Sequence, residues 1–218
     1  MPADLIKELT QLRRGILGMG AAVEQRVRQA VEAMAHRSSE EARLVCDADA
    51  EINRMELDLE ADCLRVLALY QPVAGDLRFV LAVMRINNEL ERVADLAASL
   101  THRVIALADL KVEQMPAAIL EMGRSAETML REAISSLADE SPEAARRIRL
   151  DDARVDALQK EIFAWAQQTI PAHVEYTDAA INILSISRKL ERIADMATNI
   201  AEEVIFVCEG RIVRHEEC

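Results

Sequence analysis

Aromatic side chains are scarce in this chain, where Phe, Trp and Tyr make up 3% of 218 residues. Glycine and proline are also rare, with 6 and 5 copies, although half of the residues are apolar. No segment of useful length alternates between apolar and polar residues, so strands are not expected. Aliphatic residues and methionine fill the apolar share, and this composition favours helices packed on helices.

Positive charge is in deficit as well. The formal net charge is −12, which argues against a nucleic-acid-binding surface and against broad binding to anionic membranes. No apolar run reaches ~18 residues and no signal-like segment opens the chain, so we expect a cytoplasmic protein without direct membrane insertion. The four cysteines lack C-x-x-C spacing, which indicates reduced thiols rather than a disulfide framework.

Recognisable catalytic motifs are missing too. The sequence has no glycine-rich phosphate loop, no G-x-S-x-G and no H-E-x-x-H, and its four histidines do not form a ligand set. A di-iron carboxylate enzyme in a helical bundle needs Glu-x-x-His on two helices. No Glu-x-x-His occurs here, so that alternative is weak and the chain is not expected to be an enzyme.

Six helical stretches are readable. They span about residues 5–35, 38–70, 76–110, 117–138, 141–170 and 177–208, with breaks at prolines and a stop at Gly210. The order is three helices, a break near Pro116, and three more helices. We therefore predict an all-α fold of two tandem three-helix bundles, with the first in residues 1–112 and the second in 113–218.

An internal repeat supports this division. The segment Leu90–Asp95 (LERVAD) returns as Leu190–Asp195 (LERIAD), 100 positions later, and differs at one residue. The segment that starts at Asp49 resembles the one that starts at Asp152. Because a fold requires only repeated core residues, the repeated Glu-x-x-x-Asp pair indicates something beyond packing.

Helical geometry places these acids away from the core. With 100° per residue, one apolar face is formed by Ile86, Leu90, Val93, Ala97, Leu100 and Val104, and its copy by Ile186, Leu190, Ile193, Ala197, Ile200 and Val204. Acids at i and i+4 lie ~6 Å apart and can address one ion or two adjacent ions. Oxygen ligands suit iron, manganese, magnesium or calcium. The candidate metal ligands are Glu91, Asp95, Glu191, Asp195, Asp49, Asp152, Asp156, Asn53, Asn199 and Glu202.

Two alternatives stay open at this point. In a chain with 38 acids, such pairs also arise by chance and are then simply solvated. The repeated arginines, Arg92 and Arg192, fit either surface ion pairs or the docking of a partner.

These motifs resemble the PhoU family, the accessory regulators of the high-affinity phosphate transport system. The resemblance covers nearly the whole chain and is carried by Leu90–Asp95, Leu190–Glu202 and Gln71–Arg78. Ala194 and Met196 stand where the family pattern has Gly and His, and Asn53 stands where an acid is common.

The resemblance implies two three-helix bundles and E(D)-x-x-x-D motifs that hold multinuclear metal clusters in some members. Iron is the first expectation, with manganese, magnesium and zinc as alternatives. It also implies a non-catalytic negative regulator of phosphate uptake and the starvation response. The implied partners are the ATP-binding subunit of the phosphate ABC transporter, a sensor histidine kinase and a second copy of the chain. Two alternatives remain: a metal-free docking adaptor, and a relative that serves a low-affinity phosphate transporter.

Overall fold

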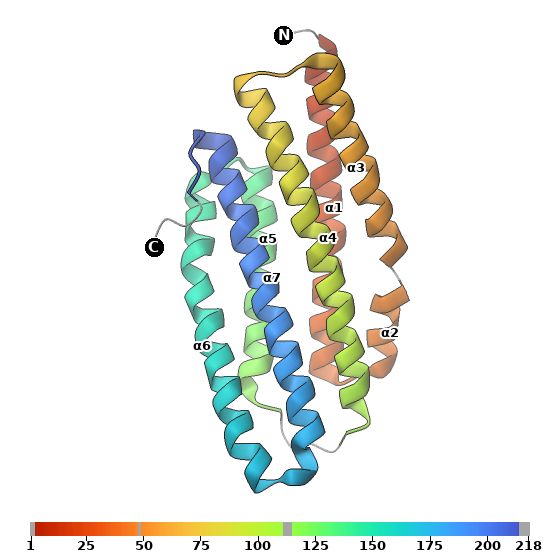
Figure 1. The fold of residues 1–218 in the computed structure, drawn as a ribbon, viewed down its shortest axis with the longest axis vertical. Coiled ribbons are helices and arrows are strands. Elements are labelled where there is room, and N and C mark those ends of the chain that lie inside the picture. Colours follow the sequence, from red (N-terminus) through yellow and green to blue (C-terminus); the bar gives the residue numbers. More distant parts are fainter. Residues whose placement is uncertain (1–2, 48, 111–114, 214–218) are drawn as a thin grey trace.

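The computed structural model describes residues 3–47, 49–110 and 115–213, and the described part contains helices and no strand. Its elongated arrangement is shown in Figure 1. The helical content of the described residues, with no strand among them, confirms the all-α prediction. The elements are α1 (Ala3–His36), α2 (Ser39–Asp47), α3 (Asp49–Tyr70), α4 (Ala74–Ala108), α5 (Ala117–Ala138), α6 (Pro142–Ala172), the 3-10 helix η1 (Val174–Tyr176) and α7 (Thr177–Glu209).

The two halves begin their second segment with the same local structure. The hydroxyl of Ser38 accepts a hydrogen bond from the backbone N–H of Glu41 at 3.2 Å, and that of Ser141 accepts one from Ala144 at 3.3 Å. The residue before each serine, Arg37 or Glu140, has a left-handed backbone with φ near 50°. These turns reverse the chain and satisfy N–H groups that the helix cannot pair itself.

The continuity of one predicted helix falls partly outside the described residues. Residues 38–70 were expected to form a single helix; α2 covers them up to Asp47 and α3 from Asp49, and the residue between the two lies outside the described part of the chain, so the continuity stays a prediction. The equivalent α6 is unbroken over Pro142–Ala172 and includes Pro171 in its last turn.

Four long helices form the centre of the molecule. Figure 1 shows α4 and α7 side by side and running in opposite directions, with α1 and α5 behind them. Helices α2 and α3 pack on α1 and α4, and α6 packs on α5 and α7. The α1–α5 contact is close: a Cβ on Gly123 would lie 2.9 Å from the Met34 side chain. The two bundles therefore share an extensive interface.

The predicted core positions are confirmed on both central helices, where Ile86 and Ile186 and the other ten members of the two faces are at most 1% exposed. The buried, half-buried and exposed pattern of residues 86–100 is identical to that of residues 186–200. Burial is wider than the single predicted face, however, because α4 and α7 contact each other as well as their own bundles. Leu96 and Met196 are consequently buried on a second face.

Within the described residues, no helix has the length and apolar character needed to cross a membrane. The described cysteines, Cys46, Cys63 and Cys208, form no disulfide. Burial, followed by the charges of Asp62 and Glu60, raises the pKa of the Cys63 thiol to about 12. The predicted division at residues 112 and 113 falls outside the described residues and stays a prediction.

Candidate functional site

The second bundle brings four predicted acidic residues into one electrostatic neighbourhood between α6 and α7. Asp152 and Asp156 are one helical turn apart on α6, and Glu191 and Asp195 are one turn apart on α7. Asp156 and Asp195 are exposed, whereas Asp152 and Glu191 are half-buried. The packing of α6 against α7 makes this cluster, since neither helix alone supplies four acids at this level.

The charges in this cluster oppose one another. Burial raises the pKa of Asp152, and Asp195 and Asp156 raise it further. Burial also raises the pKa of Glu191, with added repulsion from Asp195, Asp156 and Asp152. The pKa of Asp195 is raised by burial and by Asp156, while Arg192 acts in the opposite direction. A positive ion placed among these carboxylates would relieve this repulsion.

The chemistry of this donor set fits a hard metal ion, because all four side chains offer carboxylate oxygens. In the described residues, no three acidic, histidine or cysteine side chains are already gathered as a metal-binding group. Metal binding would therefore require the carboxylates to turn toward a common point. Their placement on two packed helices limits that movement to the side chains.

Two further predicted ligands lie toward the C-terminal end of α7. Asn199 and Glu202 are both half-buried. Glu202 lies 3.6 Å from the Arg149 guanidinium of α6, and both side chains are less than 15% exposed. Glu202 therefore already forms an ion pair with Arg149, and we do not group it with the four clustered acids.

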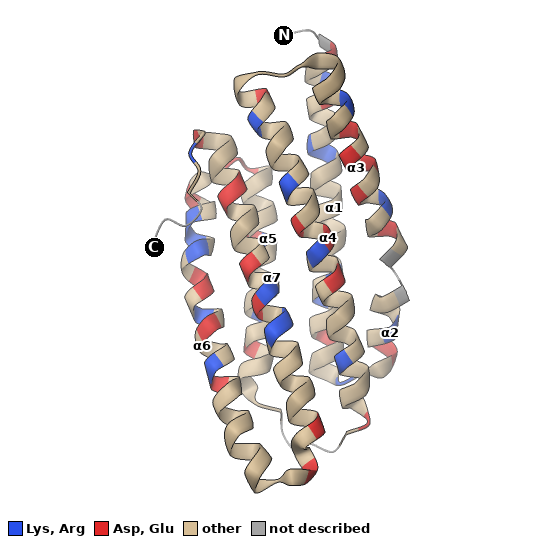
Figure 2. Ribbon diagram, in the orientation of Figure 1, with Lys and Arg blue, Asp and Glu red and all other residues tan. Residues whose placement is uncertain are grey.

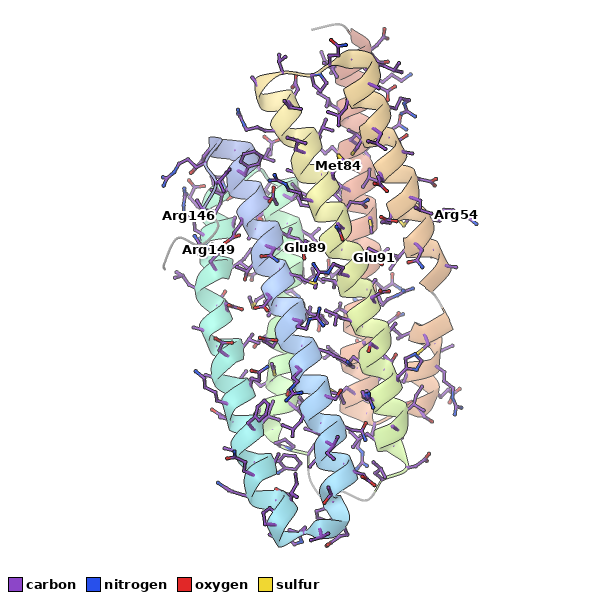
Figure 3. The ribbon with its side chains drawn as sticks, viewed as in Figure 1. Arg54, Met84, Glu89, Glu91, Arg146 and Arg149 are labelled. Carbon is purple, nitrogen blue, oxygen red and sulfur yellow. The ribbon has the colours of Figure 1, made fainter. Side chains whose placement is uncertain are left out.

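The first bundle carries a weaker version of the site. Glu91 is half-buried on α4, and Figure 3 shows it on the side of α4 that faces α3. Asp95 is exposed on α4 and Asn53 is exposed on α3. The side chain of Asp49 lies outside the described residues. The structure therefore describes two acids here, with a neutral amide at the position of Asp156.

The first bundle also differs where the second has its Arg149–Glu202 ion pair. The aligned residues are Cys46 on α2 and His102 on α4. The Cys46 Sγ lies 3.1 Å from the Thr101 hydroxyl and 3.9 Å from Nδ1 of His102. A thiol and an imidazole are softer, more neutral neighbours than a guanidinium and a carboxylate.

The repeated arginines differ in their partners. Arg92 lies 3.8 Å from Glu89, so the ion-pair interpretation holds for this residue. Arg192 forms no ion pair shorter than 4.0 Å within the described part of the chain. Both arginines line one pocket between α4 and α7.

Comparison with known proteins identifies the family and supports the fold. The family model described as "PhoU domain" matches twice, at residues 16–104 and 119–204. The chain belongs to the PhoU family. The "Phosphate-specific transport system accessory protein PhoU homolog" of Pseudomonas aeruginosa is 33% identical, over 95% of this chain and 86% of that protein. The corresponding protein of Serratia marcescens is 30% identical, over the same shares of the two chains.

Solved PhoU structures have the same fold. The crystal structure of PhoU from Pseudomonas aeruginosa matches with a TM-score of 0.90 and 31% identity, over 94% of this chain and 99% of that one. The regulatory protein PhoU from Streptococcus pneumoniae matches with a TM-score of 0.84 and 28% identity, over 96% and 99%. These relatives are named accessory or regulatory proteins rather than enzymes, which confirms the non-catalytic interpretation.

The departures from the PhoU signature have structural consequences. Ala194 is fully buried, and Met196 is 4% exposed. The Met196 thioether lines the pocket between α4 and α7 and contributes apolar packing there. The four clustered acids of the second bundle offer oxygen donors alone.

Sequence reasoning did not single out Arg149, Cys46, Lys189 or Arg103. The first two were accessible from the repeat, because aligning Asp49 with Asp152 also aligns Cys46 with Arg149. The proximity of Lys189 to Arg103 depends on which faces of α4 and α7 meet. No spacing within a single helix carries that information.

Proposed function

We propose that this PhoU-family protein is a cytoplasmic negative regulator of phosphate uptake and of the phosphate-starvation response. The supporting observation is the presence of both PhoU domains in a fold that superposes on a PhoU structure over nearly its whole length. The proposed partners are the ATP-binding subunit of a phosphate ABC transporter and a sensor histidine kinase. A rigid helical body with a strongly acidic surface suits an adaptor, because its docking surfaces keep their spacing without a ligand.

Deletion of the gene tests this function. We expect starvation-responsive promoters to stay active at high phosphate in the deletion strain, and phosphate uptake to rise. Reintroducing the full chain should restore repression. Unchanged promoter activity and uptake in the deletion strain would contradict the proposal.

We further propose that the four clustered acids of the second bundle bind divalent metal, with iron as the first expectation. The support is the mutual repulsion that raises the pKa of Asp152, Glu191 and Asp195, together with a donor set made of oxygen. When bound, metal would supply compensating positive charge and change which surfaces can dock. Asp152, Asp156, Glu191 and Asp195 would hold it.

Elemental analysis of variants tests the metal site. Replacing Glu191 and Asp195 together by Ala should abolish metal binding by the second bundle and leave helicity unchanged, because neither side chain is in the core. The matched control replaces Glu56 and Glu60 by Ala. These residues are an i,i+4 acidic pair on α3, so the control removes the same two negative charges as the test variant.

Protein prepared without an affinity tag should be loaded with iron, manganese, magnesium or zinc in parallel. Equal metal content in the two double variants would refute the metal assignment. The regulatory proposal would survive that result with the acids acting as docking charges, because the promoter assay does not depend on metal content.

A further inference from the structure

A pocket of about 320 Å³ lies in the groove where the two PhoU domains meet. It is formed by α4 and α7, which lie side by side in Figure 1. Its size is at the low end for small-molecule sites. Its lining residues are Arg92, Asp95, Leu96, Ser99, Arg192 and Met196.

The pocket is unusual because equivalent residues of the two domains converge on it. Arg92 and Arg192 occupy the same position of the repeated motif and reach the pocket from opposite helices. Leu96 and Met196 are a second equivalent pair and supply its apolar floor. Two guanidinium groups facing one small space form an anion-binding arrangement, since each can donate two parallel N–H bonds to an oxyanion.

More positive charge lies beside this pocket. Lys189 is half-buried one turn before Arg192, and Arg103 is exposed one turn after Ser99. Burial lowers the pKa of Lys189, and the positive charges of Arg103 and Arg192 lower it further. Within the described residues, none of these three cations forms an ion pair shorter than 4.0 Å. Figure 2 shows basic segments near the middle of α7.

Four carboxylates oppose an anion here, and two of them, Glu191 and Asp195, interact electrostatically with Arg192. Asp95 lines the pocket, and Glu89 lies 3.8 Å from Arg92. Figure 3 shows Glu89 on the side of α4 that faces α7. Against these stand four cations, in a chain whose net charge is −12. Cations therefore match these carboxylates in number at the pocket, whereas acids outnumber cations in the whole chain.

We propose that this pocket binds a small, doubly charged oxyanion between Arg92 and Arg192, with the Ser99 hydroxyl as a further donor. Lys189 and Arg103 add favourable potential at the side of the site. This inference deepens the proposed regulation and rests on it only for the choice of phosphate as the physiological oxyanion. A free phosphate held between the domains would bridge α4 to α7.

Equilibrium dialysis with radiolabelled inorganic phosphate tests the proposal on the full chain. The protein is first treated with a chelator, so that phosphate cannot bind through metal, and ionic strength is held constant. We expect saturable binding of one phosphate per chain. Arg192→Gln should weaken it about tenfold or more, because a hydrogen-bonded charge contact is lost.

Arg188→Gln is the matched control. It removes the same charge from the same helix, but Arg188 lies over the Phe163 ring, 5.5 Å from its centroid, and does not line the pocket. Its phosphate affinity should stay within about twofold of the parent protein. Asp95→Asn should tighten binding severalfold by removing a repulsive charge, and Arg92→Gln should repeat the Arg192→Gln result.

Absence of saturable binding at millimolar phosphate would overturn the proposal. Equal weakening by Arg188→Gln and Arg192→Gln would overturn it as well, because the effect would then be general electrostatics. Circular dichroism of each variant checks that its helices are intact. If the promoter assay shows repression while dialysis shows no phosphate binding, this inference fails and the proposed regulatory function stands.

Discussion

In the second bundle, Arg149 and Glu202 form an ion pair across α6 and α7, whereas Cys46 and His102 stand at the aligned positions of the first bundle. Around these sites, the burial pattern of residues 86–100 is repeated without change in residues 186–200. The contrast shows that packing demands have been kept in both copies. The polar residues at the margins have been free to diverge.

The divergence has a consistent direction. Asp156 of the second bundle is aligned with the neutral Asn53, and Lys189 with Glu89. The second bundle consequently concentrates charge of both signs, with an acidic cluster facing α6 and cations facing α4. A two-domain protein with one fold can in this way offer two different surfaces to partners and ions.

The largest expected effect tests the shared packing. Leu90 and Leu190 are equivalent and at most 1% exposed. Replacing either by Ala should lower the free energy of unfolding by about 2–5 kcal/mol, through lost burial and the cavity left behind. Urea denaturation of both variants measures this loss. Losses that differ by more than about 2 kcal/mol would show that the repeated burial pattern hides unequal packing.

Much of this scaffold could be predicted from the sequence. The bounds of α5 were predicted at both ends, and those of α7 to within one residue, because Pro116 and Gly210 mark them. Whether the helix predicted over residues 38–70 runs on from α2 into α3 depends on the residue between them, which lies outside the described residues. Apolar periodicity identifies what a helix buries, and flanking Pro and Gly residues indicate where a helix begins or ends.

The candidate site was predictable only in part. The repeat identified all four acids of the second bundle, and alignment identified their spacing. Whether α6 brings Asp152 and Asp156 to the acids of α7 depends on helix packing. So does the meeting of Arg92 and Arg192 in one pocket, because each residue alone fits an ordinary surface ion pair.

An intermediate effect tests the shared turns. Ser38→Ala and Ser141→Ala each remove a side-chain acceptor from the first turn of a helix. Each should lower the free energy of unfolding by about 1 kcal/mol, measured by thermal or urea denaturation. The corresponding substitutions of Ser39 and Ser125 are controls, because neither side chain caps a helix in these turns. A near-zero loss at Ser38 alone would show that the short α2 contributes little to global stability.

The smallest effect tests the diverged charges directly, by exchanging one position between the bundles. In metal-free protein at neutral pH, Asp156→Asn should raise the free energy of unfolding by about 0.2–0.5 kcal/mol, because it removes like-charge repulsion one turn from Asp152. Asn53→Asp should not raise it. For a chain of this length the gain corresponds to an increase in Tm of about 0.4–2 °C, measurable by scanning calorimetry.

The pH dependence of the free energy of unfolding tests the sign of the Asp156→Asn effect. Burial and neighbouring acids raise the folded-state pKa values of Asp152, Glu191 and Asp195 above their unfolded values. These groups therefore hold protons more tightly when folded, and their contribution to stability is present below the unfolded pKa and is lost as pH rises through the folded pKa. The advantage of Asp156→Asn should accordingly grow as pH rises from about 4 toward neutrality. An advantage that shrinks over this range would show that Asp156 does not repel the other acids. Metal should reverse the ranking at neutral pH, because a bound cation favours the full set of carboxylates over the set with one amide.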